Sequence, residues 1–256
     1  MGRFATTAAL YEELRPPYPP EFFRSVAEKL ALSERCALID LGSGPGLLAL
    51  GFAPYVGRIV GVDPEPEMIA AARRAALRAG RDLTLIEAKA EMVAADIGVF
   101  ELVTIGRALH WMDRDPTLAL FERLVAPAGA VAICASFSAT DGRNPWLDDY
   151  NAARRRWSPA GLWEASGRGE RTHRDLSSFF GGSAFHLAEL IRVETRHEIN
   201  IGDLARRVLT FSSSSPEALG NNVEAMLRDV AERLARFSRN DVITETLVST
   251  SQIVTR

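Results

Sequence analysis

The sequence predicts an α/β protein built on a doubly wound, mostly parallel β-sheet. Short apolar runs alternate with amphipathic stretches, which is typical of strands joined by crossover helices. The first apolar run leads into a glycine-rich turn at 42–46, and the second ends on an acid, Asp63. Parallel strands of such sheets present their carboxyl ends to a ligand, so both features place a binding site at one sheet edge.

The individual elements follow from periodicity and from the residues that interrupt it. Helical spacing of apolar side chains predicts a helix over 20–32, and Pro66 and Gly80 suit the start and end of a helix over 66–79. Pro16 and Pro17 end a helix expected near 6–14. Further helices are expected at about 46–55 and 115–125. The predicted strands are 36–41, 58–62, 83–87, 100–105 and 129–135.

The pattern changes after the fifth strand. Residues 137–192 contain three of the four tryptophans and show weak periodicity, so we interpret them as a helical cap insertion. A sixth strand at 193–201, helices at 202–211 and 216–237 and a seventh strand at 242–254 complete a seven-stranded sheet. The predicted divisions are therefore 1–136 (leader and cofactor-binding half), 137–192 (cap) and 193–256 (C-terminal strands and helices).

Composition excludes several classes of protein. A net charge of −3 gives no bulk attraction to nucleic acid, and the absence of a long apolar run predicts no membrane partner. Two cysteines and no signal-peptide pattern predict a cytoplasmic protein. The four histidines lack metal-ligand spacing, so no metal is expected. The oligomeric state does not follow from the sequence.

The glycine-rich turn and the acids near it favour a nucleoside-containing cofactor that carries positive charge. Glycines at 42, 44 and 46 allow close backbone approach, but Leu47 stands where a dinucleotide fingerprint needs its third glycine. Asp63, about 20 residues further on, suits a ribose diol. Asp40, just before the turn, is unfavourable beside a pyrophosphate but suits a cation such as the sulfonium and ammonium groups of S-adenosylmethionine.

The sequence resembles the class I S-adenosylmethionine-dependent methyltransferases, which have a Rossmann-like fold, and within them a small-molecule subgroup (type 11) that includes trans-aconitate-like enzymes. The matching segments are Asp40–Gly46, Asp63, Ala90-Glu91, the fourth strand, Gly106–Trp111 and the leader motif Tyr11-x-x-x-Arg15-Pro16-x-Tyr18-Pro19. The resemblance implies S-adenosylmethionine as cofactor and S-adenosylhomocysteine as product. The expected cofactor-binding residues are Asp40, Gly42, Ser43, Gly44, Gly46, Asp63, Met68, Ala90, Glu91, Arg107 and Tyr11.

Catalytic residues are less sharply indicated. His110 is the candidate general base, since its ordinary pKa of ~6.5 lies near neutral pH; the alternative is a structural histidine. Trp111, Trp146 and Tyr18 are expected in the substrate pocket. Surface or core packing is the competing interpretation for Met68 and Tyr11, and an exposed loop acid for Glu91.

These features together predict methyl transfer to a small organic acceptor, directed by proximity and orientation. Two other functions compete. A nicotinamide-dependent oxidoreductase is disfavoured by Leu47 and by the lack of a Tyr-x-x-x-Lys pair, since Lys29 and Lys89 are the only lysines. A non-catalytic cofactor-binding partner or sensor remains open, because a binding motif does not test turnover.

Overall fold

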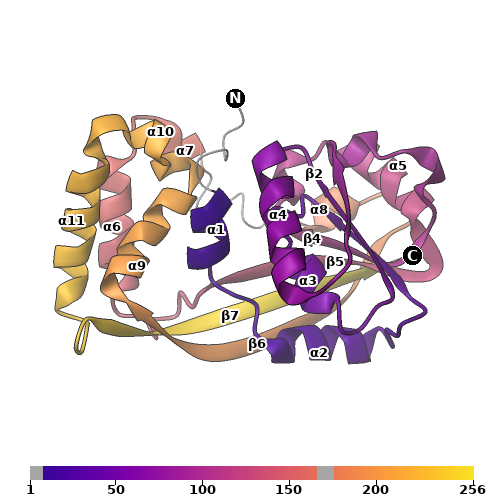
Figure 1. Cartoon of the computed structure of the whole chain (residues 1–256), viewed down its shortest axis with the longest axis horizontal. Helices are drawn as coiled ribbons and strands as arrows, with labels where there is room; N and C mark the ends of the chain where they lie inside the picture. The colour runs from indigo at the N-terminus through magenta and orange to yellow at the C-terminus, as the bar shows by residue number, and fades with distance from the viewer. Residues whose placement is uncertain (1–7, 166–175) are drawn as a thin grey trace. The chain divides into compact units, whose positions relative to one another are not determined.

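The computed structural model describes residues 8–165 and 176–256 of the chain (Figure 1). Its seven strands form one sheet in the order β3-β2-β1-β4-β5-β7-β6. Pairing is parallel between β1 and β2, β1 and β4, β2 and β3, and β4 and β5. The strands are β1 (Ala37–Leu41), β2 (Arg58–Asp63), β3 (Thr84–Glu87), β4 (Phe100–Gly106), β5 (Val125–Ser138), β6 (His186–Asn200) and β7 (Val242–Thr255). The predicted doubly wound, mostly parallel seven-stranded sheet is confirmed.

The chain divides into two compact units, each built from several segments, and the predicted divisions at 136/137 and 192/193 stay predictions. One unit comprises 17–135, 172–193 and 249–256, and the other comprises 1–16, 136–171 and 194–248. The leader therefore groups with the region after β5 rather than with the cofactor-binding half. The boundaries fall inside β5, β6 and β7, so these long strands belong partly to each unit. β5 and β6 begin in the first unit and end in the second, whereas β7 begins in the second and ends in the first.

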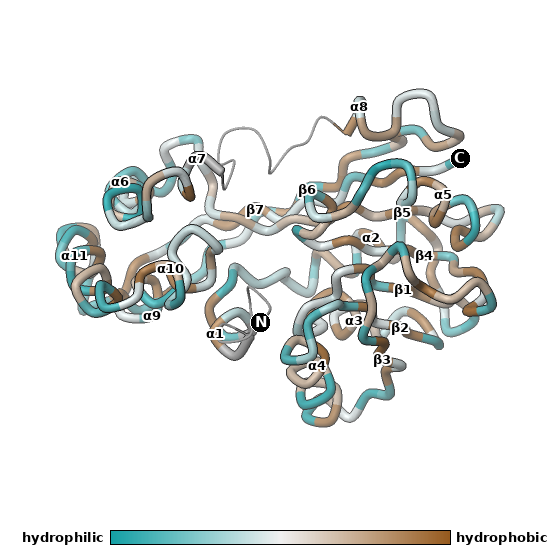
Figure 2. The backbone as a smooth tube through the Cα atoms, turned by 90° about the horizontal axis from the view of Figure 1, so that it is seen from above, coloured by the Kyte–Doolittle hydropathy of each residue, from teal (hydrophilic) through white to brown (hydrophobic). Residues whose placement is uncertain are grey.

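The first unit carries the glycine-rich turn. Its described helices are α2 (Pro20–Lys29), α3 (Leu47–Phe52), α4 (Pro66–Ala79), α5 (Arg114–Leu124) and α8 (Leu176–Phe180), with 3-10 turns η1 (Ala90–Met92), η2 (Ala95–Ile97) and η3 (Leu109–Trp111). Figure 2 shows hydrophilic and hydrophobic residues alternating along α4, as an amphipathic helix requires.

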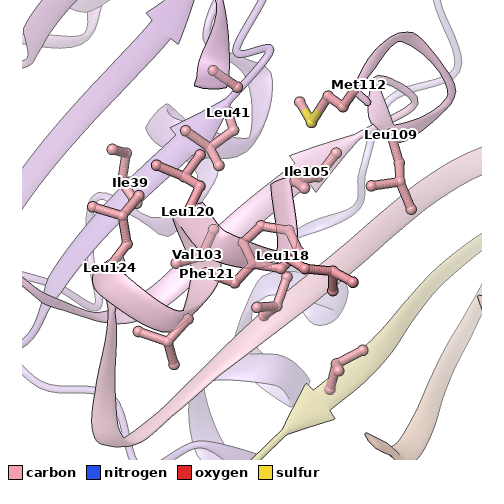
Figure 3. Packing of buried hydrophobic residues seen from close by; sticks show 14 of the residues in the cluster. Ile39, Leu41, Val103, Ile105, Leu109, Met112, Leu118, Leu120, Phe121 and Leu124 are labelled. Atoms are coloured by element: carbon pink, nitrogen blue, oxygen red, sulfur yellow. The ribbon is translucent and has the colours of Figure 1, made fainter. Parts of the chain in front are cut away.

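Burial on both faces explains the nearly continuous apolar sequence of the central strands. One cluster packs Ile39, Val103 and Ile105 against Phe121 and Leu124 of α5, as Figure 3 shows. The opposite cluster packs Leu38 and Leu102 with side chains of α2 and α3. Buried side chains thus pack on both faces of the sheet. This packing fixes the positions of the strand ends and of the turns that follow them.

The second unit has its own core. Its described helices are α1 (Ala8–Leu14), α6 (Leu147–Trp157), α7 (Leu162–Ala165), α9 (Ile201–Arg206), α10 (Pro216–Leu219) and α11 (Val223–Ala235), with 3-10 turns η4 (Arg207–Thr210), η5 (Ser212–Ser214) and η6 (Gly220–Asn222). Buried Arg207 pairs with buried Glu245 at 2.8 Å and donates to Leu14 O at 2.6 Å. Arg15 donates to Thr210 O at 2.6 Å, so two arginines hold the leader helix in this unit.

Element boundaries in the C-terminal half depart from the sequence expectations. β6 begins at His186 rather than 193, and most of its residues are exposed or half-buried because it is the last strand of the sheet order. An exposed edge strand lacks the apolar pattern from which strands are predicted. The helix expected over 216–237 is broken at Gly220, which has a left-handed φ of 56°. The middle of the predicted cap, 166–175, lies outside the described residues.

Candidate functional site

The turn after β1 requires glycine for two different reasons. Gly42, Gly44 and Gly46 have φ of 68°, 54° and 86°, which side chains rarely tolerate. A Cβ on Gly42 would lie 2.5 Å from the Ala108 Cβ, so this glycine allows two loops to pack. A Cβ on Gly44 would meet nothing within 4 Å, so open space faces its backbone. The turn therefore has one packed glycine and one that leaves room for a ligand.

Asp63 at the end of β2 holds this turn in place. Its Oδ2 accepts from the Gly44 N–H at 2.8 Å, and its Oδ1 accepts from the Glu65 N–H at 3.0 Å. Burial raises the pKa of Asp63, against these two backbone hydrogen bonds, which lower it. Each carboxylate oxygen retains acceptor capacity. Asp63 can therefore bind a ligand hydroxyl beside Gly44, as the ribose prediction requires.

Asp40 lies beneath the turn, where burial suppresses its charge. It is 1% exposed, and its Oδ1 accepts a hydrogen bond from the Thr104 hydroxyl at 2.8 Å. Burial raises the pKa of Asp40 to about 7, partly offset by hydrogen bonds from Thr104 and the Ala49 backbone. Nearby Asp63 raises it further. A cation bound next to Asp40 would favour its ionised form, which suits a cationic cofactor.

Thr104 is a site residue that sequence reasoning missed. Its side chain is fully buried on β4, next to Asp40 in the parallel register between β1 and β4. The available signal was a polar residue within the apolar run Leu102–Ile105. A buried hydroxyl needs a partner, and in an apolar strand that partner comes from a neighbouring strand.

The end of β4 carries Arg107 in an unusual backbone conformation. Its φ is 58°, although it is not glycine, and its N–H donates to Cys134 O at 3.2 Å. The guanidinium carbon lies 5.3 Å from the centroid of the Tyr18 ring. Tyr18, predicted in the substrate pocket, packs on Phe22 with ring centroids 5.0 Å apart. Tyr18 thus connects α2 to the strand end at which the methyl donor is expected.

The next turn, η3, presents the candidate base and an aromatic surface. The rings of His110 and Trp111 lie 4.8 Å apart at 43°, and Trp111 is 51% exposed. Glu91 Oε1 accepts from the Asp113 N–H at 3.1 Å, which ties η1 to the start of α5. The predicted adenine-side pair, Ala90 and Glu91, is therefore held close to the loop that carries His110.

The remaining predicted residues fall in different surroundings. Met68 is buried in α4, and Ser43 has a buried hydroxyl with no hydrogen-bond partner in the described part of the chain. Trp146 lies in the second unit at 1% exposure, packed edge-on against Tyr150. This side chain packs in the core of the second unit, and its pocket role stays a prediction. Tyr11 also lies in the second unit, in α1, beneath the Arg15 guanidinium.

Metal binding and membrane insertion are two further possibilities for the described residues. Over 8–165 and 176–256, no group of three or more His, Cys, Asp or Glu side chains is arranged to hold a metal ion. Within the same ranges, no helix has the length and apolarity needed to cross a membrane. Both cysteines, Cys36 and Cys134, are free thiols.

The residues present fit S-adenosylmethionine. The open space at Gly44 allows a ligand to approach the backbone closely, and the Asp63 oxygens can accept from ribose hydroxyls. The buried acid Asp40 suits a cationic group. In the first unit the structure brings together the turn, both acids, Arg107 and the η3 loop. It places Tyr11 and Trp146 in the second unit.

Comparison with known proteins agrees with this geometry. Residues 39–133 match the family described as "Methyltransferase domain". An uncharacterized methyltransferase of Schizosaccharomyces pombe is 23% identical over 249 residues, covering 95% of this chain and 93% of the relative.

Solved structures share the fold. A provisionally assigned type II methyltransferase from Anaeromyxobacter dehalogenans has a TM-score of 0.65 at 20% identity, covering 94% of this chain and 97% of that one. A methyltransferase from Thiobacillus denitrificans, crystallised with S-adenosylhomocysteine, has a TM-score of 0.59 at 17% identity, covering 100% and 98%. The sheet order and these similarities agree: residues 39–133 match the methyltransferase domain, and the chain has the fold of S-adenosylmethionine-dependent methyltransferases.

Proposed function

We propose that the chain transfers the methyl group of S-adenosylmethionine to a small organic acceptor, mainly by holding the two reactants in line. The observation that carries the proposal is the cradle at Gly44, whose open backbone face lies beside the Asp63 carboxylate. The dinucleotide fingerprint needs its last glycine at position 47, where this chain has Leu47. This difference supports S-adenosylmethionine over a dinucleotide.

Two acids of the first unit, Asp63 and Asp40, have defined parts in this proposal. Asp63 binds the ribose hydroxyls and keeps the turn in its left-handed conformation, while ionised Asp40 stabilises the cationic end of the cofactor. The bound cofactor supplies an already activated methyl group. Alignment alone contributes about 7–11 kcal/mol to such transfers, so the protein needs no acid or base for an acceptor that is already nucleophilic.

The acceptor binds beyond β4 in this proposal. Trp111 exposes half of its surface there and offers an apolar face with a polar edge to an organic molecule. His110 next to it serves as general base when the acceptor has to lose a proton. Met68, Ala90, Glu91 and Ser43 complete the proposed cofactor-binding set in the first unit. The cytoplasm is the proposed location.

Calorimetric titration with S-adenosylhomocysteine tests the cofactor, with NADH as the control ligand. Micromolar binding to wild type, weakened in Asp63→Ala and absent for NADH, supports the proposal. An acceptor panel with release of S-adenosylhomocysteine as readout then tests turnover. Tight binding without release across carboxylate, phenol, amine and thiol acceptors would favour a non-catalytic cofactor-binding protein.

The role of His110 is tested by the pH profile of the His110→Gln variant. With an acceptor that ionises during transfer, a general base predicts a lower kcat and loss of the acidic limb of the pH profile. A structural histidine predicts an unchanged profile shape together with a lower Tm.

A further inference from the structure

We propose that β6 is the surface through which the chain binds a second copy of itself. In the proposed dimer the two β6 strands pair antiparallel about a two-fold axis at Thr195 and join the two sheets into one. The partner is a second copy because the charges along β6 are complementary to themselves. This dimer is independent of methyl transfer.

The first observation is the open edge of the sheet at β6. The sheet order ends with β7-β6, so in the ranges 8–165 and 176–256 β6 has a neighbouring strand on one side only. An edge strand presents a row of backbone N–H and C=O groups to which a further strand can hydrogen-bond. Pairing of this kind is a common way for one chain to bind another.

β6 lacks most features that protect an edge strand from such pairing. It runs for 15 residues, His186–Asn200, and contains neither proline nor glycine. Natural edge strands are usually protected by shortness, by proline or by charged side chains. β6 has only the charges, so the order of these charges determines what it can pair with.

The charges lie on one face of the strand. Ile191 and Ile199 are buried, whereas the even-numbered residues of 188–200 are all exposed. Alternate side chains of a strand share a face, so the exposed residues form one row. The charged members of this row are Arg192, Glu194, Arg196 and Glu198.

This row is complementary to itself about Thr195. In an antiparallel pair centred there, Arg192 lies opposite Glu198 of the second copy, and Glu194 lies opposite Arg196. Two-fold symmetry makes each contact twice. On the packed face the same register places Ile191 opposite Ile199, so apolar side chains also meet.

Other registers are less favourable. A centre at 194 or at 196 would place arginine opposite arginine and glutamate opposite glutamate, and a centre at 193 or 197 keeps only one of the two charge contacts. Opposite charges that face each other across strands stabilise the pair, and like charges destabilise it. The charges therefore select the register centred on Thr195.

A contact within the chain is compatible with this pairing. Glu194 forms an ion pair with Arg143 at 2.5 Å, and both side chains are exposed. A carboxylate can accept hydrogen bonds from two arginines, so Glu194 can bind Arg143 and Arg196 of the second copy together. Backbone hydrogen bonds then supply affinity, and the charges supply register.

Sedimentation velocity from micromolar to submillimolar concentration tests the dimer. Wild type should show a concentration-dependent equilibrium between monomer and dimer. Glu198→Arg and Arg192→Glu each place like charges opposite each other twice, and each should raise the dimer dissociation constant about ten- to thirtyfold. Glu34→Arg makes the same charge change as Glu198→Arg at an exposed acid in the turn before β1, and it should dimerise like wild type.

Mixing the two charge-reversed variants tests the register. In a heterodimer of Glu198→Arg with Arg192→Glu, opposite charges face each other at both contacts, so the mixture should dimerise about as tightly as wild type. The double variant Arg192→Glu/Glu198→Arg should also recover wild-type affinity. All of these variants should keep the wild-type Tm, because they change exposed side chains.

Three results would overturn the proposal. The first is a wild type that stays monomeric over the whole concentration range. The second is dimerisation of both single variants with wild-type affinity. The third is a mixture of the single variants that associates no more tightly than either variant alone.

Discussion

We predict that Asp40 couples folding and cofactor binding to pH in opposite directions. Its carboxyl holds a proton up to about pH 7 in the folded chain, against an ordinary pKa of 3.8. Between these values the folded state binds more protons than the unfolded state, so the free energy of unfolding falls as pH rises through this window. The full difference corresponds to on the order of 4 kcal/mol.

The Asp40→Asn variant removes this titration. The asparagine side chain is similar in size, and its Oδ1 can still accept from the Thr104 hydroxyl. Its amide accepts the hydrogen bond from the Ala49 N–H less favourably than a carboxylate does. Urea denaturation of the cofactor-free proteins at pH 4 to 8 measures the effect. We expect the wild-type free energy of unfolding to drop relative to the variant by several kcal/mol across this range. The exposed acid Asp82, changed to Asn, is the matched control and should follow wild type.

Binding should show the opposite trend. Because a cationic cofactor favours the Asp40 carboxylate, wild-type affinity for S-adenosylmethionine should rise about tenfold per pH unit below pH 7 and then level off. Asp40→Asn should bind more weakly at pH 8, with a flatter profile. If wild type and variant have the same pH slopes in unfolding and binding, the buried acid is not the coupled group and this reasoning is refuted.

Three further predictions follow from single contacts. Asp63→Ala should weaken S-adenosylhomocysteine binding by about ten- to hundredfold in calorimetry, since a hydrogen bond to a charged group contributes about 1.5–3 kcal/mol; unchanged affinity would remove Asp63 from the site. Gly42→Ala should lower the unfolding free energy well beyond Gly80→Ala, because both have left-handed φ but only Gly42 would clash, at 2.5 Å; equal urea midpoints would contradict the packing argument. Arg207→Met should cost about 3–5 kcal/mol by leaving Glu245 charged and buried, whereas loss of the exposed Arg236 should cost under about 1 kcal/mol; similar losses in thermal unfolding would show that the Arg207 pair is not effectively buried.

The conformation of the glycine-rich turn was largely predictable from the sequence, because its requirements are local. Alternating glycines at 42, 44 and 46 indicate, within five residues, a backbone conformation that other residues rarely adopt. The structure shows all three in the left-handed region. Asp63 was placed at the end of β2 by the apolar run before it. The structure adds that its carboxylate binds the Gly44 N–H, which the sequence did not show.

Prediction failed where distant segments meet. The Thr104 hydroxyl reaches Asp40 across 64 positions, and the leader is held by Arg207, 193 positions from Leu14. The 1% exposure of Trp146 and its packing in the core of the second unit were also not visible in the sequence. Residue type shows what a side chain can do, but burial and partners depend on which elements pack around it.

The sequence by itself determined the fold class, the strand and helix order of the first 135 residues and the glycine-and-acid site, because periodicity and turn chemistry act over short windows. Tertiary structure alone decided that the leader groups with the region after β5, that the edge strand β6 starts at His186, and that Arg107 lies over Tyr18. The physical reason is the same in each case: these arrangements depend on which surfaces pack together once the sheet has formed.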